Sequence, residues 1–141
     1  MTLPKIRRPF SVTLLALSVL SFTAIHLVRF GAALAQWSFL ASLPLSVPPL
    51  YLATTGLVWG MVGLVLYPGL WLGKLWAKKA VFFAAPVYGL YYWLEQVFFM
   101  DSPLRNANWL FQIFLSIFLL ALLVWVIRRP ATRTYFGESH E

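Results

Sequence analysis

Hydrophobic residues fill long stretches of this chain without a charged residue between them. Asp, Glu, Lys and Arg are absent from Pro9–Val28, Phe30–Gly73 and Asn106–Ile127, and Ala80–Leu94 is a fourth uncharged run. A helix of about 20 apolar residues matches the thickness of the hydrocarbon core of a bilayer. The pattern therefore predicts an all-α, polytopic membrane protein.

Prolines divide the longest of these runs. Pro44, Pro48 and Pro49 would each interrupt a helix, whereas Trp37 and Phe39 are typical of the membrane interface. We therefore expect a short interfacial helix between the first and second spans. The prediction is a single transmembrane domain, residues 1–141, with short tails and four transmembrane helices at about residues 10–30, 50–72, 80–100 and 105–127.

Basic residues fall at alternate ends of these spans. The positions before the first span, between the second and third, and after the fourth hold nine of the 11 Lys and Arg residues: Lys5, Arg7, Arg8, Lys74, Lys78, Lys79, Arg128, Arg129 and Arg133. The opposite ends hold Arg29 and Arg105. Lys and Arg near span ends are retained in the cytoplasm. We expect a bacterial inner-membrane protein with both termini cytoplasmic.

The composition excludes several classes of function. Of 141 residues, 61% are hydrophobic and 11% are charged, against about 25% charged in ordinary soluble domains. The net charge of +7 lies at the span ends and suits anionic lipid head groups, so we expect no nucleic acid partner. The chain has no cysteine, which excludes thiolate zinc sites, iron–sulfur clusters and covalently attached c-type haem. We expect no metal and no cofactor.

Polar residues recur near the outer ends of three predicted spans. With a helical rise of about 1.5 Å per residue, one level of the membrane would hold most of the following set: His26, Arg29, Tyr88, Tyr92, Glu95, Gln96, Asn108 and Gln112. Asn108 and Gln112 also share a helix face with Ser116, since these three recur every fourth residue.

Ionisable groups inside a membrane are costly and are usually paired. One interpretation of the polar set is a structural cluster around an Arg29–Glu95 ion pair. The other is an outward-opening polar pocket for a quinone or a lipid head group, with Tyr91 and Trp93 completing its aromatic walls. A third possibility is that His26 ligates haem or a pigment, although a lone histidine is more often a hydrogen-bonding partner.

Small residues form a stripe on the second span. Ala53, Gly56, Gly60 and Gly63 are spaced by three or four residues and so share one helix face. Such stripes allow another helix backbone to approach closely. We expect this helix-packing face to be used inside the chain rather than in a dimer.

Signatures of catalysis are absent from the sequence. It has no HExxH pair, no nucleophile motif and no glycine-rich phosphate loop. Polar groups are also scarce at the predicted midplane, where a transport path would need them. We therefore do not expect an enzyme or a transporter.

Three short strings, RRPF (Arg7–Phe10), PPLYLA (Pro48–Ala53) and YYWLEQ (Tyr91–Gln96), carry a wider resemblance. The chain resembles small four-helix proteins of bacterial inner membranes, some of which are accessory subunits of respiratory or photosynthetic electron-transfer complexes. The resemblance implies a non-catalytic accessory or structural subunit, whose partners are membrane lipids and other membrane-protein subunits. The alternative functions are a stand-alone binder or carrier of a quinone-like or lipid ligand, and haem or pigment binding through His26.

Overall fold

The computed structural model describes residues 8–43, 47–99 and 103–137, and side chains within these ranges except at 99 and 103–107. This part of the chain is helical, and it contains no strand. The helices are α1 (Phe10–Ala35), α2 (Trp37–Ser42), α3 (Pro49–Trp71), α4 (Leu75–Phe99), α5 (Pro103–Arg128) and α6 (Pro130–Tyr135). The all-α prediction is confirmed. The tail residues Lys5 and Arg7, used to predict the topology, lie outside the described residues.

Proline and glycine mark the helix boundaries. Pro49 and Pro130 occupy the first turns of α3 and α6, where a missing N–H costs little because it would have no partner in the helix. Gly73 has a φ of 67°, in the left-handed region that glycine adopts without strain. Gly73 therefore lets the chain reverse between α3 and α4 within three residues.

Three segments of the described chain are long and apolar enough to cross a membrane: α1, α3 and Asn108–Arg128 of α5. Helix α4 coincides with the predicted third span and is 25 residues long. It is not among these three segments, and it carries Lys78 and Lys79 near one end and Glu95 near the other. Four spans and an interfacial location for α2 therefore stay predictions.

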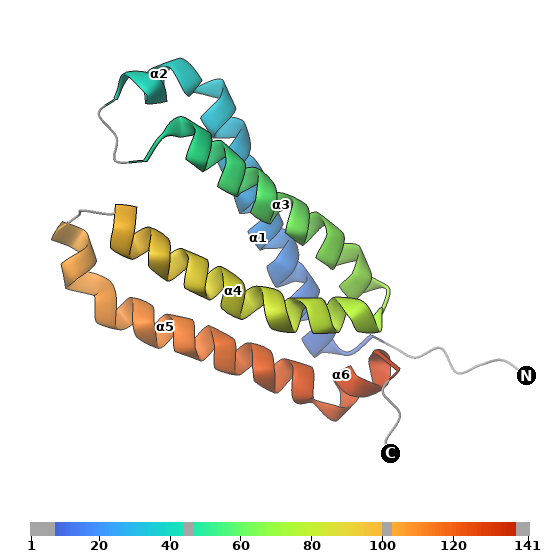
Figure 1. The fold of residues 1–141 in the computed structure, drawn as a ribbon. Helices are drawn as coiled ribbons and strands as arrows, with labels where there is room; N and C mark the ends of the chain where they lie inside the picture. The colour runs from blue at the N-terminus through green and yellow to red at the C-terminus, as the bar shows by residue number, and fades with distance from the viewer. Residues whose placement is uncertain (1–7, 44–46, 100–102, 138–141) are drawn as a thin grey trace, which may run out of the picture.

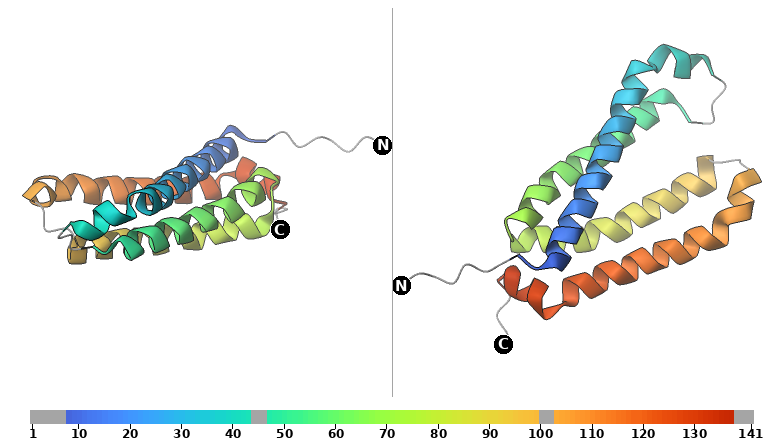
Figure 2. Two further views of the ribbon diagram at one scale, coloured as in Figure 1. Left: turned by 90° about the horizontal axis from the view of Figure 1, so that it is seen from above. Right: turned by 180° about the vertical axis from the view of Figure 1, so that it is seen from behind.

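The long helices form two antiparallel pairs. Helices α1 and α3 make one pair, joined through α2, and α4 and α5 make the other (Figure 1). The pairs meet at the turn between α3 and α4 and diverge away from it, as the view from behind also shows (Figure 2). Helix α6 lies at the meeting point, beside the start of α1. The described domain is thus a V whose apex holds both ends of the described chain.

The hydrophobic core lies at this apex. Its buried members are Val12, Ala16, Leu66, Leu70, Ala77, Val81 and Phe136. They come from α1, α3 and α4 and from the residue after α6, so burial at the apex joins the two helix pairs. The two pairs diverge beyond this core (Figure 1).

The small-residue stripe of α3 faces α1. A Cβ atom built on Gly56 would lie 2.9 Å from the backbone nitrogen of Phe30 and 3.0 Å from the carbonyl oxygen of His26. A Cβ on Gly63 would collide with the Thr23 hydroxyl. Ala53 is also buried. The stripe is therefore used within the chain, and it brings the two backbones into direct contact.

Candidate functional site

The apex is held together by polar contacts as well as by its core. The Arg8 guanidinium lies 3.5 Å from the centre of the Trp71 ring and donates to the Trp71 carbonyl oxygen at 3.2 Å. The Tyr135 hydroxyl donates to the same carbonyl at 2.8 Å. A buried hydrogen bond of 3.1 Å joins Ser11 to Thr132. These contacts tie the start of α1 and helix α6 to the end of α3.

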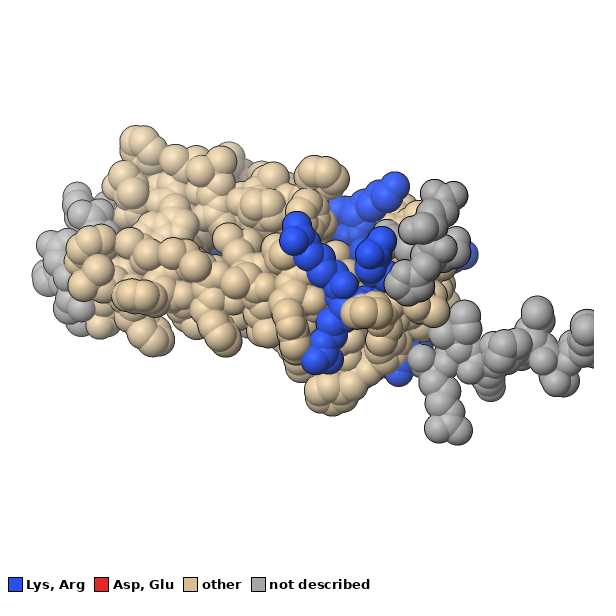
Figure 3. Space-filling view, turned by 90° about the horizontal axis from the view of Figure 1, so that it is seen from below, with Lys and Arg blue, Asp and Glu red and all other residues tan. Residues whose placement is uncertain are grey.

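Basic side chains gather at this same end of the molecule, as Figure 3 shows. The described members are Arg8, Lys74, Lys78, Lys79, Arg128, Arg129 and Arg133. All of them flank the helix ends that meet at the apex. The gathering of cations at one end is the arrangement from which the topology was predicted, and we refer to it as the basic end.

An ion pair links α1 to α4 away from the basic end. The Arg29 Nη2 atom donates to Glu95 Oε1 at 2.7 Å, with the two side chains 30% and 12% exposed. Each charge would be costly alone in a membrane, and the pair satisfies both. The structure thus contains the structural ion pair that the sequence suggested.

His26 lies beside this pair in an aromatic cluster. Its ring is 4.4 Å from that of Phe22, and its Nε2 atom is 3.3 Å from the Tyr88 hydroxyl. The cluster continues through Trp59 and Tyr91. His26 is 3% exposed, and its Nδ1 atom is also buried. The Nδ1 atom has no hydrogen-bond partner among the described residues. These residues also contain no group of three or more His, Cys, Asp or Glu side chains that could hold a metal ion. Haem or pigment binding through His26 stays a prediction.

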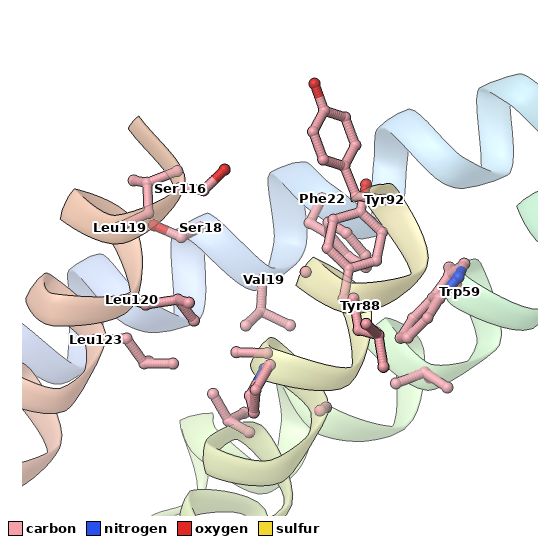
Figure 4. A pocket seen from close by; sticks show the side chains of 18 of the residues that line it. Ser18, Val19, Phe22, Trp59, Tyr88, Tyr92, Ser116, Leu119, Leu120 and Leu123 are labelled. Carbon is pink, nitrogen blue, oxygen red and sulfur yellow. The ribbon is translucent and has the colours of Figure 1, made fainter. Parts of the chain in front are cut away.

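A cleft of about 780 Å³ opens between the two helix pairs (Figure 4). Side chains of α1, α3, α4 and α5 all line it. In Figure 4, Leu120 and Leu123 point from α5 toward Val19 of α1. Sites for small organic ligands typically enclose about 300–1,000 Å³ and are mainly apolar with a few polar groups. The cleft has that size and that character.

The lining changes character along the cleft. Near the basic end it is aliphatic, with Leu15, Leu66, Val81 and Leu123. Toward the other end it becomes aromatic and polar, with Trp59, Tyr88, Tyr92, Trp93 and Gln112. At about 1.5 Å of rise per residue, Gln112 and Leu123 lie about 16 Å apart along α5. The cleft is therefore amphipathic along its length.

The predicted polar set divides between two places. Tyr88, Tyr92 and Gln112 line the cleft. His26, Arg29 and Glu95 form the adjoining cluster and do not line the cleft. Gln96 is half-buried, has an interaction of its own and lies outside the cleft, while Asn108 is exposed. The polar set thus contributes both to an ion-pair cluster and to a cleft, with Tyr88 in contact with both.

Comparison with known proteins gives no relative. No protein-family model matches the sequence, and no curated protein and no solved structure matches it. The cleft and the polar cluster beside it are therefore the features that bear on function.

Three further residues that line the cleft were not among the predicted site residues: Ser116, Phe22 and Trp59. Ser116 was visible in the sequence as the next member of the Asn108–Gln112 face. Phe22 and Trp59 were not, because each lies inside an uncharged apolar run where nothing distinguishes a cleft-facing aromatic residue from a lipid-facing one.

Proposed function

We propose that this protein binds a membrane-soluble amphipathic ligand, of quinone or lipid type, in the cleft between its two helix pairs. The observation that supports the proposal is a cleft of about 780 Å³ with aliphatic walls at one end and aromatic and amide groups at the other. An apolar ligand tail would be buried along the aliphatic walls, and a polar head would meet the amide and aromatic groups.

The proposal includes α4 as a fourth transmembrane helix. Two of its polar residues have partners inside the protein, since Tyr88 contacts His26 and Glu95 pairs with Arg29. Its opposite face exposes apolar side chains at alternating spacings of four and three: Phe83, Val87, Leu90, Leu94 and Val97. This spacing forms one stripe along a helix, which is suited to contact with lipid.

We further propose that the basic end faces the cytoplasm of a bacterial cell, with both termini on that side. The described Lys and Arg residues apart from Arg29 and Arg105 flank helix ends at this end, in accord with the retention of such residues in the cytoplasm. The ligand head would then lie toward the outer half of the inner membrane.

Tryptophan fluorescence gives a direct test of binding. Trp59 and Trp93 line the cleft, whereas Trp125 stacks on Arg129 near the basic end. Decylubiquinone, a quinone with a short tail, should quench the fluorescence of the detergent-purified protein in a saturable manner. The combined Trp59→Phe and Trp93→Phe variant should lose most of this saturable signal, while Trp125→Phe should keep it. Quenching that rises linearly in all three proteins would reflect partition into the micelle and would contradict the proposal.

A second candidate function is the non-catalytic accessory subunit implied by the resemblance. The supporting observation is a stripe of large aromatic side chains on α5, where Phe111, Phe114 and Phe118 are 67%, 72% and 61% exposed. A stripe of this kind could pack against a helix of another subunit. Purification of the tagged protein in mild detergent should then recover stoichiometric partners, and replacing the three Phe residues with Leu should release them. A protein that purifies alone would count against this function.

A further inference from the structure

We infer that the cleft selects an amphiphile with an uncharged head group, and that the Gln112 side chain hydrogen-bonds to that head. The inference rests on the ligand binding proposed above and specifies the chemistry that the cleft would recognise. Two observations support it: no charged side chain lines the cleft among the described residues, and the side-chain oxygen of Gln112 has no hydrogen-bond partner there.

No charged side chain lines the cleft among the described residues. In the adjoining cluster, the Arg29 Nη2 and Glu95 Oε1 atoms lie 2.7 Å apart, so each of these two charges already has a partner. A phosphate or carboxylate head brought into the cleft would find no cation, and burying an unpaired charge is very costly. The lining therefore favours a neutral head and disfavours an anionic phospholipid head.

Three polar side chains of the lining already have hydrogen-bond partners within the protein. The Ser116 hydroxyl donates to the Gln112 backbone carbonyl at 2.7 Å, and the Ser18 hydroxyl donates to the Leu14 carbonyl at 2.9 Å. The Tyr88 hydroxyl is engaged with His26. These groups satisfy one another or their own helices, which leaves less capacity for a ligand.

Gln112 is different, because its side-chain oxygen is buried without a hydrogen-bond partner among the described residues. A buried polar atom without a partner costs free energy that a suitable partner would restore. The amide offers an acceptor at one end and donors at the other, and a half turn about its last side-chain bond exchanges them. Gln112 can therefore donate to a quinone carbonyl or accept from a hydroxyl.

The position of Gln112 also orients the ligand. It lies at the polar end of the cleft, and the aliphatic walls run from there toward Leu123 over about 16 Å. A head group held at Gln112 would direct its tail along these walls toward the basic end. The cleft thus fits a neutral head followed by an apolar chain.

Two matched α5 variants test the role of Gln112. Gln112→Leu removes the amide from the cleft, and Asn108→Leu removes an amide from an exposed position outside it. In the quenching assay, Gln112→Leu should weaken decylubiquinone binding by roughly tenfold, the value of one hydrogen bond, and Asn108→Leu should change it less than twofold. Gln112→Met, which preserves side-chain length, serves as a second variant if Gln112→Leu does not fold.

Competition by two amphiphiles of equal tail length tests the selection of a neutral head. 1-Dodecanol should displace decylubiquinone from the wild-type protein, and monododecyl phosphate should not. This inference alone would be overturned in either of two cases. In the first, the wild type binds decylubiquinone and the Gln112 variants bind it with the same affinity. In the second, monododecyl phosphate displaces decylubiquinone as well as 1-dodecanol does. The absence of saturable binding in the wild type would overturn the proposed function together with it.

Discussion

The two helix pairs are built from similarly apolar residues but are packed in different ways. In α1 and α3, buried residues occur along most of the length, from Ser11 to Ala33 and from Ala53 to Leu70. In the described parts of α4 and α5, the buried residues lie close to the basic end: Ala77, Lys78, Val81, Val126 and Ile127. One pair is a continuous seam, and the other is anchored at one end.

This contrast indicates that side-chain size, rather than hydrophobicity, decides how closely membrane helices pack. Lipid tails are as apolar as leucine, so apolar surface alone gives two helices little reason to associate. The α1–α3 seam forms because glycines let the backbones touch. Large residues of α4 and α5, such as Tyr92 and Leu119, face the opening instead and leave the cleft between the pairs.

The same substitution in the two pairs should have opposite effects, and this is the largest effect we expect. Gly56→Ala places a methyl group against the backbone of α1 at 2.9 and 3.0 Å, so it should destabilise the fold by roughly 3 kcal/mol. Gly89→Ala in α4 meets nothing within 4 Å and should be neutral or stabilising by up to about 1 kcal/mol, the helix preference for alanine. Thermal unfolding of both variants measures the difference. Equal shifts would contradict the comparison.

Loss of one partner of the Arg29–Glu95 pair should have the second-largest effect on stability. Glu95→Gln leaves the Arg29 charge without its carboxylate and should cost roughly 1–2 kcal/mol, a value reduced by the partial exposure of Arg29. Because Glu95 does not line the cleft, affinity for decylubiquinone should stay within twofold.

A double-mutant cycle with Arg29→Gln sharpens this prediction. The double variant should recover part of the stability, since neither charge is left alone. Additive losses would show that the two side chains act separately, and a loss of quinone affinity in folded Glu95→Gln would place the carboxylate in the ligand site.

Filling the cleft should affect binding and leave the fold nearly unchanged. Ala85 lines the cleft on α4, and Ala85→Leu would occupy part of the space available to a ligand tail. We expect about a tenfold loss of decylubiquinone affinity, since displaced apolar burial is worth about 0.8 kcal/mol per CH₂ group. Ala32→Leu, at an exposed position of α1, is the matched control and should bind normally. A stability loss in Ala85→Leu like that of Gly56→Ala would mean that the pairs pack equally closely.

The smallest effect concerns the contact that anchors α6 at the apex. Tyr135→Phe removes the 2.8 Å hydrogen bond to the Trp71 carbonyl. We expect a loss of about 0.5 kcal/mol in thermal unfolding, the lower value for one hydrogen bond, because the site is exposed. Thr134→Ala removes a hydroxyl whose hydrogen bond, among the described residues, is to the Pro130 carbonyl of the same helix, and it should cost less. A larger loss in Thr134→Ala would mean that α6 contributes through its own stability rather than through this contact.

The helices could be predicted from the sequence because the rules that select them are local. A span needs only an uncharged apolar run of sufficient length, as in α1, α3 and the Asn108–Arg128 segment. Helix α4 shows the limit of the rule. Its Tyr88 and Glu95 contact residues of α1. Because such polar residues lower the mean hydropathy of the segment, the rule recognises this helix less readily as a span.

The candidate site could be predicted only in part. The level shared by Arg29 and Glu95 follows from span boundaries and helical rise, and their pairing follows from the cost of isolated charges in a membrane. Gln112 was predicted at that level too, yet it faces the cleft rather than the ion pair. Rise along a helix gives depth, whereas the direction in which a side chain points depends on how the whole helix is rotated against its neighbours.

The helical class and the gathering of cations at one end follow from the amino-acid sequence, because each depends on the order of residues along the chain. Three features could be seen only once the helices were packed together: the glycine contacts between α1 and α3, the divergence of α4 and α5 from that pair, and the cleft between the pairs. Those features depend on distances between separate helices, which are set by side-chain volumes meeting across a seam and not by any periodicity within one segment.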